Sequence, residues 1–213
     1  YLSPEELWHK TFSDQNHWRE KFTNVPFENK SGTWQLRYYQ EIAVQRTVEA
    51  IAQGKQRILL TLATGTGKTA IAFQIAWKLF QTRLNLKRDG SRRPRILFLA
   101  DRNALVRQAK NNFTEHLKDL SSIDLSAEKE NNLTRLVFST YPSMMNKIDS
   151  LRDADERFYG VGHFDLIIVD EAHGAGILSD FNLFLIVIGW IFKISLASFN
   201  VLYSTSSIRK DLL

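Results

Sequence analysis

The sequence predicts an α/β domain of three layers, in which a mostly parallel sheet lies between helices on both of its faces. Short apolar runs at 58–62, 96–99, 136–138 and 166–169 have the length and composition of strands inside such a sheet. Segments with apolar residues at helical spacing separate these runs. Strands that alternate with helices form parallel sheets, because each connecting helix packs back onto the sheet.

The first 34 residues are expected to lead in from a preceding domain and to pack on the main one. Ser3, Pro4 and Glu6 predict a helix start, since Ser3 and Glu6 can form a capping box and proline suits the first helical position. Residues 12–34 are rich in aromatic and polar residues without a clear period. We call residues 1–34 the lead-in.

The main domain is expected to span 35–213, with 177–213 as an atypical apolar tail. Its first helix ends at Gly54, where a C-cap would fall. The run at 58–62 follows as a strand that we expect to be covered on both faces. A helix at about 68–81 comes next. The clearest amphipathic helix carries Val106, Ala109, Phe113, Leu117 and Leu120.

The composition indicates a soluble globular protein and excludes several kinds of site. The chain is 44% hydrophobic and 24% charged, as in ordinary soluble globular proteins. It has no cysteine, which excludes disulfides, thiolate zinc sites and cysteine nucleophiles and fits a cytoplasmic protein. The five histidines lack metal-ligand spacing. The sequence begins at Tyr1 without a charged and apolar leader, so we expect no signal peptide and a piece of a longer polypeptide.

Basic residues gather in one stretch of the chain. Such a cluster is typical either of a phosphate-binding surface or of a solvated loop between a helix and a strand, and the sequence leaves both open. Its members are Arg83, Lys87, Arg88, Arg92, Arg93, Arg95 and Arg102.

A phosphate loop follows the first apolar run and precedes a helix. Its glycines let the backbone curl so that amide groups point at phosphate oxygens, and the helix N-terminus adds partial positive charge. Lys68 would reach the β- and γ-phosphates of ATP, and the Thr69 hydroxyl would bind Mg²⁺. Leu62 stands where the strict pattern has glycine. The loop consists of Thr64, Gly65, Thr66, Gly67, Lys68 and Thr69.

An acidic motif, Asp170-Glu171-Ala172-His173, follows the apolar run at 166–169. Asp170 would hold Mg²⁺ opposite Thr69, and Glu171 would orient and deprotonate the attacking water. The alternative is a surface acidic pair after a buried strand. The phosphate loop about a hundred residues upstream favours the catalytic interpretation.

These motifs resemble those of a known family. The acidic motif is similar to that of DEAH-type superfamily 2 motors, which have RecA-like domains. Longer segments resemble the first motor domain of the restriction subunit of type I restriction-modification enzymes: R-Y-Y-Q (37–40), L-L-T-L-A-T-G-T-G-K-T-A-I-A-F-Q-I-A-W-K-L-F-Q (59–81) and R-R-P-R-I-L-F-L-A-D-R-N (92–103). The segment W-R-E-K-F…V-P-F (18–27) resembles the family's lead-in. The match covers roughly 18–173.

The resemblance implies an ATP- and Mg²⁺-dependent motor that moves on double-stranded DNA. It also implies partners: a second RecA-like domain, an upstream nuclease domain, and the specificity and modification subunits of the complex. By position, Gln40 matches the glutamine that reads the adenine edge, and His173 matches a coupling residue. Arg102 and Asn103 match a motif that contacts the DNA backbone. Thr140 matches a threonine that donates to a DNA phosphate, although it could equally be a helix cap.

The tail departs from the family. Gly174 replaces an arginine, and 204–211 is an eroded version of the threonine-alanine-threonine-proline motif. The apolar stretch 183–192 is too short to span a membrane, and we expect it to complete the sheet as a strand or helix. Without the second motor domain's arginine finger, hydrolysis by this chain should be very weak. Two alternatives remain: a truncated non-catalytic remnant that binds nucleic acid or a partner, and another superfamily 2 helicase acting on RNA.

Overall fold

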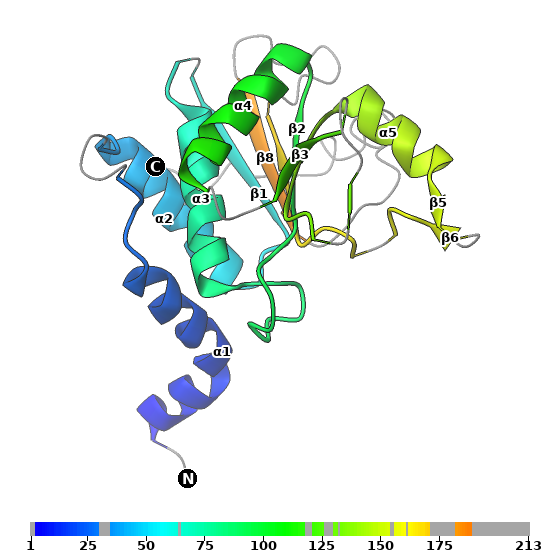
Figure 1. Ribbon diagram of the computed structural model, residues 1–213. Helices are drawn as coiled ribbons and strands as arrows, with labels where there is room; N and C mark the ends of the chain where they lie inside the picture. Colours follow the sequence, from blue (N-terminus) through cyan, green and yellow to red (C-terminus); the bar gives the residue numbers. More distant parts are fainter. Residues whose placement is uncertain are drawn as a thin grey trace, which may run out of the picture.

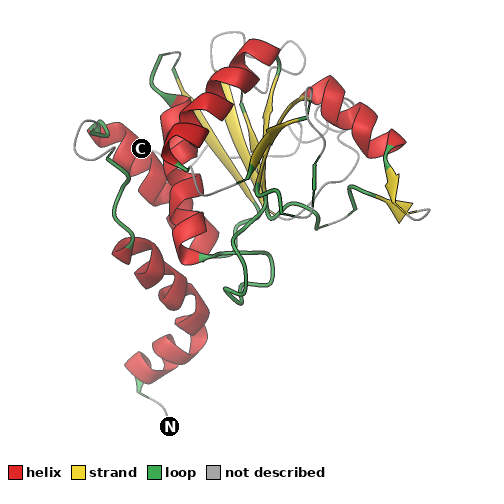
Figure 2. Cartoon of the chain, viewed as in Figure 1, coloured by secondary structure: helices red, strands yellow, loops and turns green. Residues whose placement is uncertain are grey.

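The computed structural model describes most of the chain as helices around a central sheet (Figures 1 and 2). It describes residues 3–29, 35–63, 65–117, 121–125, 130–131, 133–153, 156–160, 162–170 and 182–188. The helices are α1 (Pro4–Asn24), α2 (Tyr38–Ala52), α3 (Lys68–Thr82), α4 (Asn103–His116) and α5 (Tyr141–Ser150). The strands are β1 (Arg57–Leu62), β2 (Ile96–Ala100), β3 (Ser122–Asp124), β4 (Leu136–Thr140), β5 (Arg152–Asp153), β6 (Glu156–Arg157), β7 (Leu166–Val169) and β8 (Asn182–Ile188).

The main sheet has the strand order β1-β8-β7-β2-β4-β3. Strands β7, β2, β4 and β3 are parallel to one another, whereas β8 is antiparallel to both β1 and β7. β5 and β6 form a separate two-stranded ribbon. The expectation of an α/β domain with a mostly parallel sheet is therefore confirmed.

Two apolar cores lie on the two faces of the sheet, because neighbouring residues of a strand point to opposite faces. On one face Phe98 and Phe138 pack with α2, α3 and α4, and ribbons of these helices cover that side in Figure 1. On the other face Leu97 and Val137 pack with α5 and the segment around Phe164. The domain thus has three layers, with strands β2, β4 and β7 buried throughout.

Strand β1 differs from the expectation that it is covered on both faces. Its residues alternate between exposed and partly buried, and Leu59 is 49% exposed. Ile58, Leu60 and Leu62 pack against the helical layer, whereas the opposite face of β1 is open in the described part of the chain. The expectation was wrong because an apolar run does not reveal whether both faces of its strand are covered by other elements.

The lead-in is more regular than its sequence indicated, since α1 continues to Asn24 through residues that show no clear period. The predicted capping box is present: Ser3 Oγ accepts from Glu6 N at 3.2 Å, and Glu6 Oε2 accepts from Ser3 N at 2.8 Å. Trp18 and Phe22 are 1% and 2% exposed and belong to the same core as α2 and α3. The lead-in therefore packs on the main domain.

The tail supplies one described element, β8. It pairs Asn182 with Leu62 of β1 and Leu185 with Val169 of β7, so the apolar stretch completes the sheet as a strand. Residues 171–181 and 189–213 lie outside the described part. No helix of the described residues is long and apolar enough to cross a membrane.

Candidate nucleotide-binding site

Five described strands run in the same direction, and four of them, β1, β7, β2 and β4, carry predicted site residues where they end. β1 and β7 are each antiparallel to β8, so they run in the same direction, and β2 and β4 are parallel to β7. Ligands of such sheets bind beyond the carboxyl ends of the strands. We call this side the carboxyl edge. In strand order it carries the phosphate loop after β1, Asp170 after β7, Arg102 and Asn103 after β2, and Thr140 at the end of β4.

The phosphate loop has the backbone that its glycines predict. Gly65 and Gly67 have φ of 78° and 81°, a conformation that other residues rarely adopt. Gly67 is the N-cap of α3, so Lys68 and Thr69 lie in the first turn, where backbone N–H groups have no partner within the helix. Both side chains are partly exposed. Thr64 lies outside the described residues.

Gln40 lies against the phosphate loop. Its Nε2 donates to the Thr66 carbonyl oxygen at 2.8 Å, and its Oε1 accepts from Arg37 N at 3.0 Å. The side chain is buried, and a Cβ at position 67 would lie 2.5 Å from Nε2, so only glycine fits there. An amide has two N–H groups and two acceptor lone pairs, so Gln40 retains the capacity for the adenine contact, which stays a prediction.

Asp170 ends β7 in a buried position. Its backbone N donates to the Leu99 carbonyl at 2.8 Å, and the Tyr141 hydroxyl donates to the Asp170 carbonyl at 3.4 Å. Among the described residues no group of three or more His, Cys, Asp or Glu side chains could hold a metal. The predicted metal ligands among the described residues are the Asp170 carboxylate and the Thr69 hydroxyl. These hard oxygen donors suit Mg²⁺ when phosphates and water complete its coordination shell. Glu171 and His173 lie outside the described residues.

The three predicted DNA contacts share the carboxyl edge but differ in exposure. The Arg102 side chain is 79% exposed, with its nearest acidic partner, Asp101, at 3.3 Å. Asn103 is exposed in the first turn of α4. Thr140 is buried at the N-cap position of α5, where its hydroxyl donates to Ser143 Oγ at 3.0 Å. The Thr140 side chain makes no capping bond to the backbone of α5, so both interpretations of this residue stay open, and all three DNA contacts stay predictions.

Part of the basic stretch has partners inside the chain. Arg88 donates to the Ala52 carbonyl at 2.8 Å, at the C-terminal end of α2. Arg92 donates through both terminal nitrogens to Asp165, at 2.6 and 3.0 Å. The sequence pattern does not single out Asp165, although an acidic residue directly before a buried strand could have indicated it. For Arg88 and Arg92 the structure therefore favours a role in holding the loop over a role in binding phosphate.

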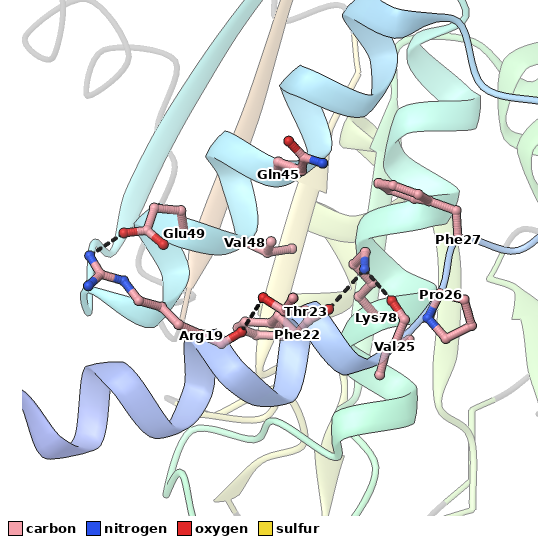
Figure 3. A pocket seen from close by; sticks show the side chains of 10 residues that line it. All are labelled: Arg19, Phe22, Thr23, Val25, Pro26, Phe27, Gln45, Val48, Glu49 and Lys78. Carbon is pink, nitrogen blue, oxygen red and sulfur yellow. Dashed lines mark hydrogen bonds and ion pairs between the residues drawn. The ribbon is translucent and has the colours of Figure 1, made fainter.

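A cavity of about 350 Å³ lies between α1, α2 and α3, away from the phosphate loop (Figure 3). Lys78 reaches across it from α3, and its Nζ donates to the carbonyl oxygens of Phe22 at 2.9 Å and Val25 at 2.5 Å. The ammonium also lies 4.6 Å from the centre of the Phe27 ring. None of the residues lining the cavity belongs to the phosphate loop. The cavity therefore lies at the contact between the lead-in and α2 and α3 of the main domain, and not at the nucleotide site. We call this contact the joint.

Comparison with known proteins agrees with the motifs. Residues 33–183 match the family described as "Type III restriction enzyme, res subunit". The chain is 35% identical over 81% of its length to the type I restriction enzyme EcoAI endonuclease subunit of Escherichia coli, and 34% identical over 82% to the EcoKI endonuclease subunit of Escherichia coli strain K12. It spans 20% and 14% of those relatives. It is also 28% identical over 65% of its length to the putative ATP-dependent helicase IRC3 of Saccharomyces cerevisiae, of which it spans 19%.

A solved structure supports the same assignment. A fragment of a putative HsdR subunit of a type I restriction enzyme from Vibrio vulnificus YJ016 is 33% identical, with a TM-score of 0.54. The match covers 81% of this chain and 28% of that one. The resemblance to the first motor domain of type I restriction subunits is thereby confirmed. The chain belongs to the restriction-enzyme res-subunit family, as an ATP-dependent helicase-like domain of the kind found in type I restriction enzymes.

Proposed function

We propose that this chain is the nucleotide-binding motor domain of a DNA translocase, which hydrolyses ATP to move along double-stranded DNA. The observation that carries the proposal is the shared carboxyl edge, where the phosphate loop and Asp170 follow strands of the same direction. One strand lies between them, so β1 and β7 are roughly 10 Å apart. ATP with its phosphates on the loop would extend its γ-phosphate toward Asp170.

Each predicted residue has a role in this reaction. Lys68 would bind the β- and γ-phosphates, and Thr69 and Asp170 would hold Mg²⁺ from opposite sides. Bound Mg²⁺ would neutralise charge that develops on the phosphate oxygens. Glu171 would orient the attacking water and take its proton. Because phosphoryl transfer needs little covalent chemistry, these residues act mainly through position and charge.

DNA and the other components of the enzyme are part of the proposal. Arg102 and Asn103 would contact the DNA backbone at the carboxyl edge, which positions the motor without reading sequence. A second RecA-like domain would supply an arginine finger, a group that is worth about 10³ to 10⁵ in rate in P-loop GTPases. A nuclease domain and the specificity and modification subunits would complete the enzyme. We therefore expect this chain by itself to bind MgATP and to hydrolyse it slowly.

Equilibrium binding of a fluorescent ATP analogue tests the nucleotide site. Lys68→Ala should abolish measurable binding, and Asp170→Asn should weaken the dependence of binding on Mg²⁺. Lys87→Ala is the matched control, since this exposed lysine lies in the loop between α3 and β2. Binding that is absent, or that is indifferent to Lys68→Ala and Asp170→Asn, would favour a non-catalytic remnant instead.

Stimulation of phosphate release tests the nucleic acid. We expect double-stranded DNA to raise the rate above the basal level, and Arg102→Ala to reduce this stimulation without reducing ATP binding. The stimulation should weaken steeply with added salt, because contacts with the DNA backbone release counterions. Stimulation by RNA and not by DNA would favour an RNA helicase.

A further inference from the structure

The carbonyl oxygen of Thr66, inside the phosphate loop, accepts two hydrogen bonds from the first turn of α2. Gln40 Nε2 donates at 2.8 Å, and the Tyr39 hydroxyl donates at 3.2 Å. Both donors come from neighbouring residues at the start of one helix, so they approach the carbonyl from the same side of the loop. The Thr66 carbonyl is therefore held toward α2.

The direction of this carbonyl sets the direction of the next amide group. No described peptide bond is cis, and in a trans peptide the C=O and the following N–H point in opposite directions. A Thr66 carbonyl held toward α2 therefore turns the Gly67 N–H away from α2. Gly67 is the N-cap of α3, and its own carbonyl accepts from Ala70 N and Ile71 N at 2.9 and 3.1 Å. The Gly67 N–H thus points to the outer side of a helix N-terminus, where an anion binds.

Tyr39 is the separable part of this arrangement. Gln40 also closes the start of α2 by accepting from Arg37 N, so its replacement would change several contacts at once. The Tyr39 hydroxyl, in contrast, accepts from Arg37 Nη1 at 3.2 Å and donates to the Thr66 carbonyl. A hydroxyl that accepts from a cation is a stronger donor in turn. Removing this one oxygen would loosen the Thr66–Gly67 peptide and leave the tyrosine ring in place.

We propose that Tyr39 is a positioning residue for phosphate binding: through the Thr66 carbonyl, its hydroxyl holds the Gly67 N–H in the direction that meets a phosphate oxygen. The inference rests on the proposed function, because it assumes that the loop binds a polyphosphate. Tyr39 acts on the loop and not on the base. Loss of the Tyr39 hydroxyl should therefore lower the affinity for every ligand that carries the polyphosphate by the same factor. The affinity for a ligand without phosphates should not change.

The test compares Tyr39→Phe with Tyr38→Phe, using isothermal titration of MgATP, magnesium tripolyphosphate and adenosine. Tyr38 is the matched control, because it is the adjacent tyrosine and the residue is 77% exposed. One hydrogen bond corresponds to an affinity change of about three- to tenfold. We expect Tyr39→Phe to weaken MgATP and tripolyphosphate by this factor and to leave adenosine unchanged, and Tyr38→Phe to change none of the three.

Thermal unfolding of the ligand-free variants and the ¹H–¹⁵N signal of Gly67 separate positioning from general damage. Tyr39→Phe should keep the unfolding temperature within a few degrees of the parent chain, and the Gly67 signal should respond less to tripolyphosphate. Equal tripolyphosphate affinity in the parent and Tyr39→Phe would overturn the inference, as would an equal loss for adenosine. If the parent chain binds no MgATP, the proposed function fails first and the inference falls with it.

Discussion

The two ends of α3 differ in what they contact. The N-terminal end begins in the phosphate loop, where Gly67 has a left-handed backbone and Lys68 and Thr69 are partly exposed. The first turn of α2 contacts the loop through Tyr39 and Gln40. The middle and the C-terminal half of α3 are covered by residues 22–28, the segment in which α1 ends. This segment packs across α3 at the joint (Figure 3).

Side chains of α3 bind the backbone of that segment. Gln74 Nε2 donates to the Glu28 carbonyl at 2.7 Å, and Gln74 Oε1 accepts from Glu28 N at 3.0 Å. Trp77 Nε1 donates to the Pro26 carbonyl at 3.1 Å, and Lys78 donates to two carbonyls of the same segment. Lys78 is 5% exposed, so these contacts replace the water that its ammonium has lost.

One end of α3 thus belongs to the joint with the lead-in, and the other end belongs to the candidate nucleotide site. At the C-terminal half, side chains find their partners within the chain, so their loss should lower stability. At the N-terminal end, the helix amides are directed outward after a glycine with a left-handed backbone, so changes there should lower ligand affinity more than stability. If stability and ATP affinity depend on different ends of α3, changes at each end should affect one property more than the other.

Deletion of residues 1–34 should have the largest effect. It removes Trp18 and Phe22 from the core and leaves Lys78 without its two carbonyl acceptors. Each aromatic contributes roughly 1.5–3 kcal/mol by burial, so the free energy of unfolding in urea should fall by about 5 kcal/mol. Deletion of residues 1–16 is the control and should cost much less. A chain of residues 35–213 as stable as the parent would show that the joint is not part of the domain.

Gly67→Ala should impair the other end of the helix. The new Cβ would lie 2.5 Å from Gln40 Nε2, at a φ of 81° that alanine rarely adopts. We expect ATP affinity to fall thirty- to hundredfold, or about 2–3 kcal/mol. Gly54→Ala is the matched control, since Gly54 has a φ of 78° at the end of α2 and more room. It should lower stability by about 1 kcal/mol and leave ATP affinity unchanged.

Lys78→Met should lower stability and spare ATP binding, whereas Lys68→Met should abolish ATP binding and spare stability. Methionine keeps most of the apolar stem of Lys78 but cannot donate to the Phe22 and Val25 carbonyls. The free energy of unfolding should fall by about 2 kcal/mol, with ATP affinity unchanged. Lys68→Met should abolish ATP binding and leave stability within about 0.5 kcal/mol. Paired urea unfolding and ATP titrations measure both; loss of ATP affinity in Lys78→Met would mean that the two ends are coupled.

The pH dependence of the joint should be the smallest effect. Burial lowers the pKa of Lys78 in the folded chain below its ordinary value of 10.5. The unfolded chain therefore holds this proton more tightly, and stability rises as the pH increases through the folded pKa toward 10.5. The stability difference between the parent chain and Lys78→Met should accordingly grow between neutral and alkaline pH. A difference that shrinks over this range would contradict the direction.

The sequence by itself determined features that depend on neighbours along the chain. The capping box of Ser3 and Glu6 is a four-residue pattern, and it is present as expected. The order of strand, phosphate loop and helix is equally local, because the left-handed Gly67 and the start of α3 follow directly from the spacing of the residues. Asp170 was placed correctly at the end of a buried strand for the same reason.

Only the tertiary structure decided which distant groups meet. Lys78 and its carbonyl acceptors are 53 and 56 positions apart, and Arg92 and Asp165 are 73 apart. The antiparallel pairing of β8 between β1 and β7, and the uncovered face of β1 that exposes Leu59, also depend on long-range contacts. Periodicity reports which face of an element is apolar, but it does not report which partner covers that face. The choice of partner belongs to the packing of the whole domain, where burial and hydrogen bonding are satisfied together.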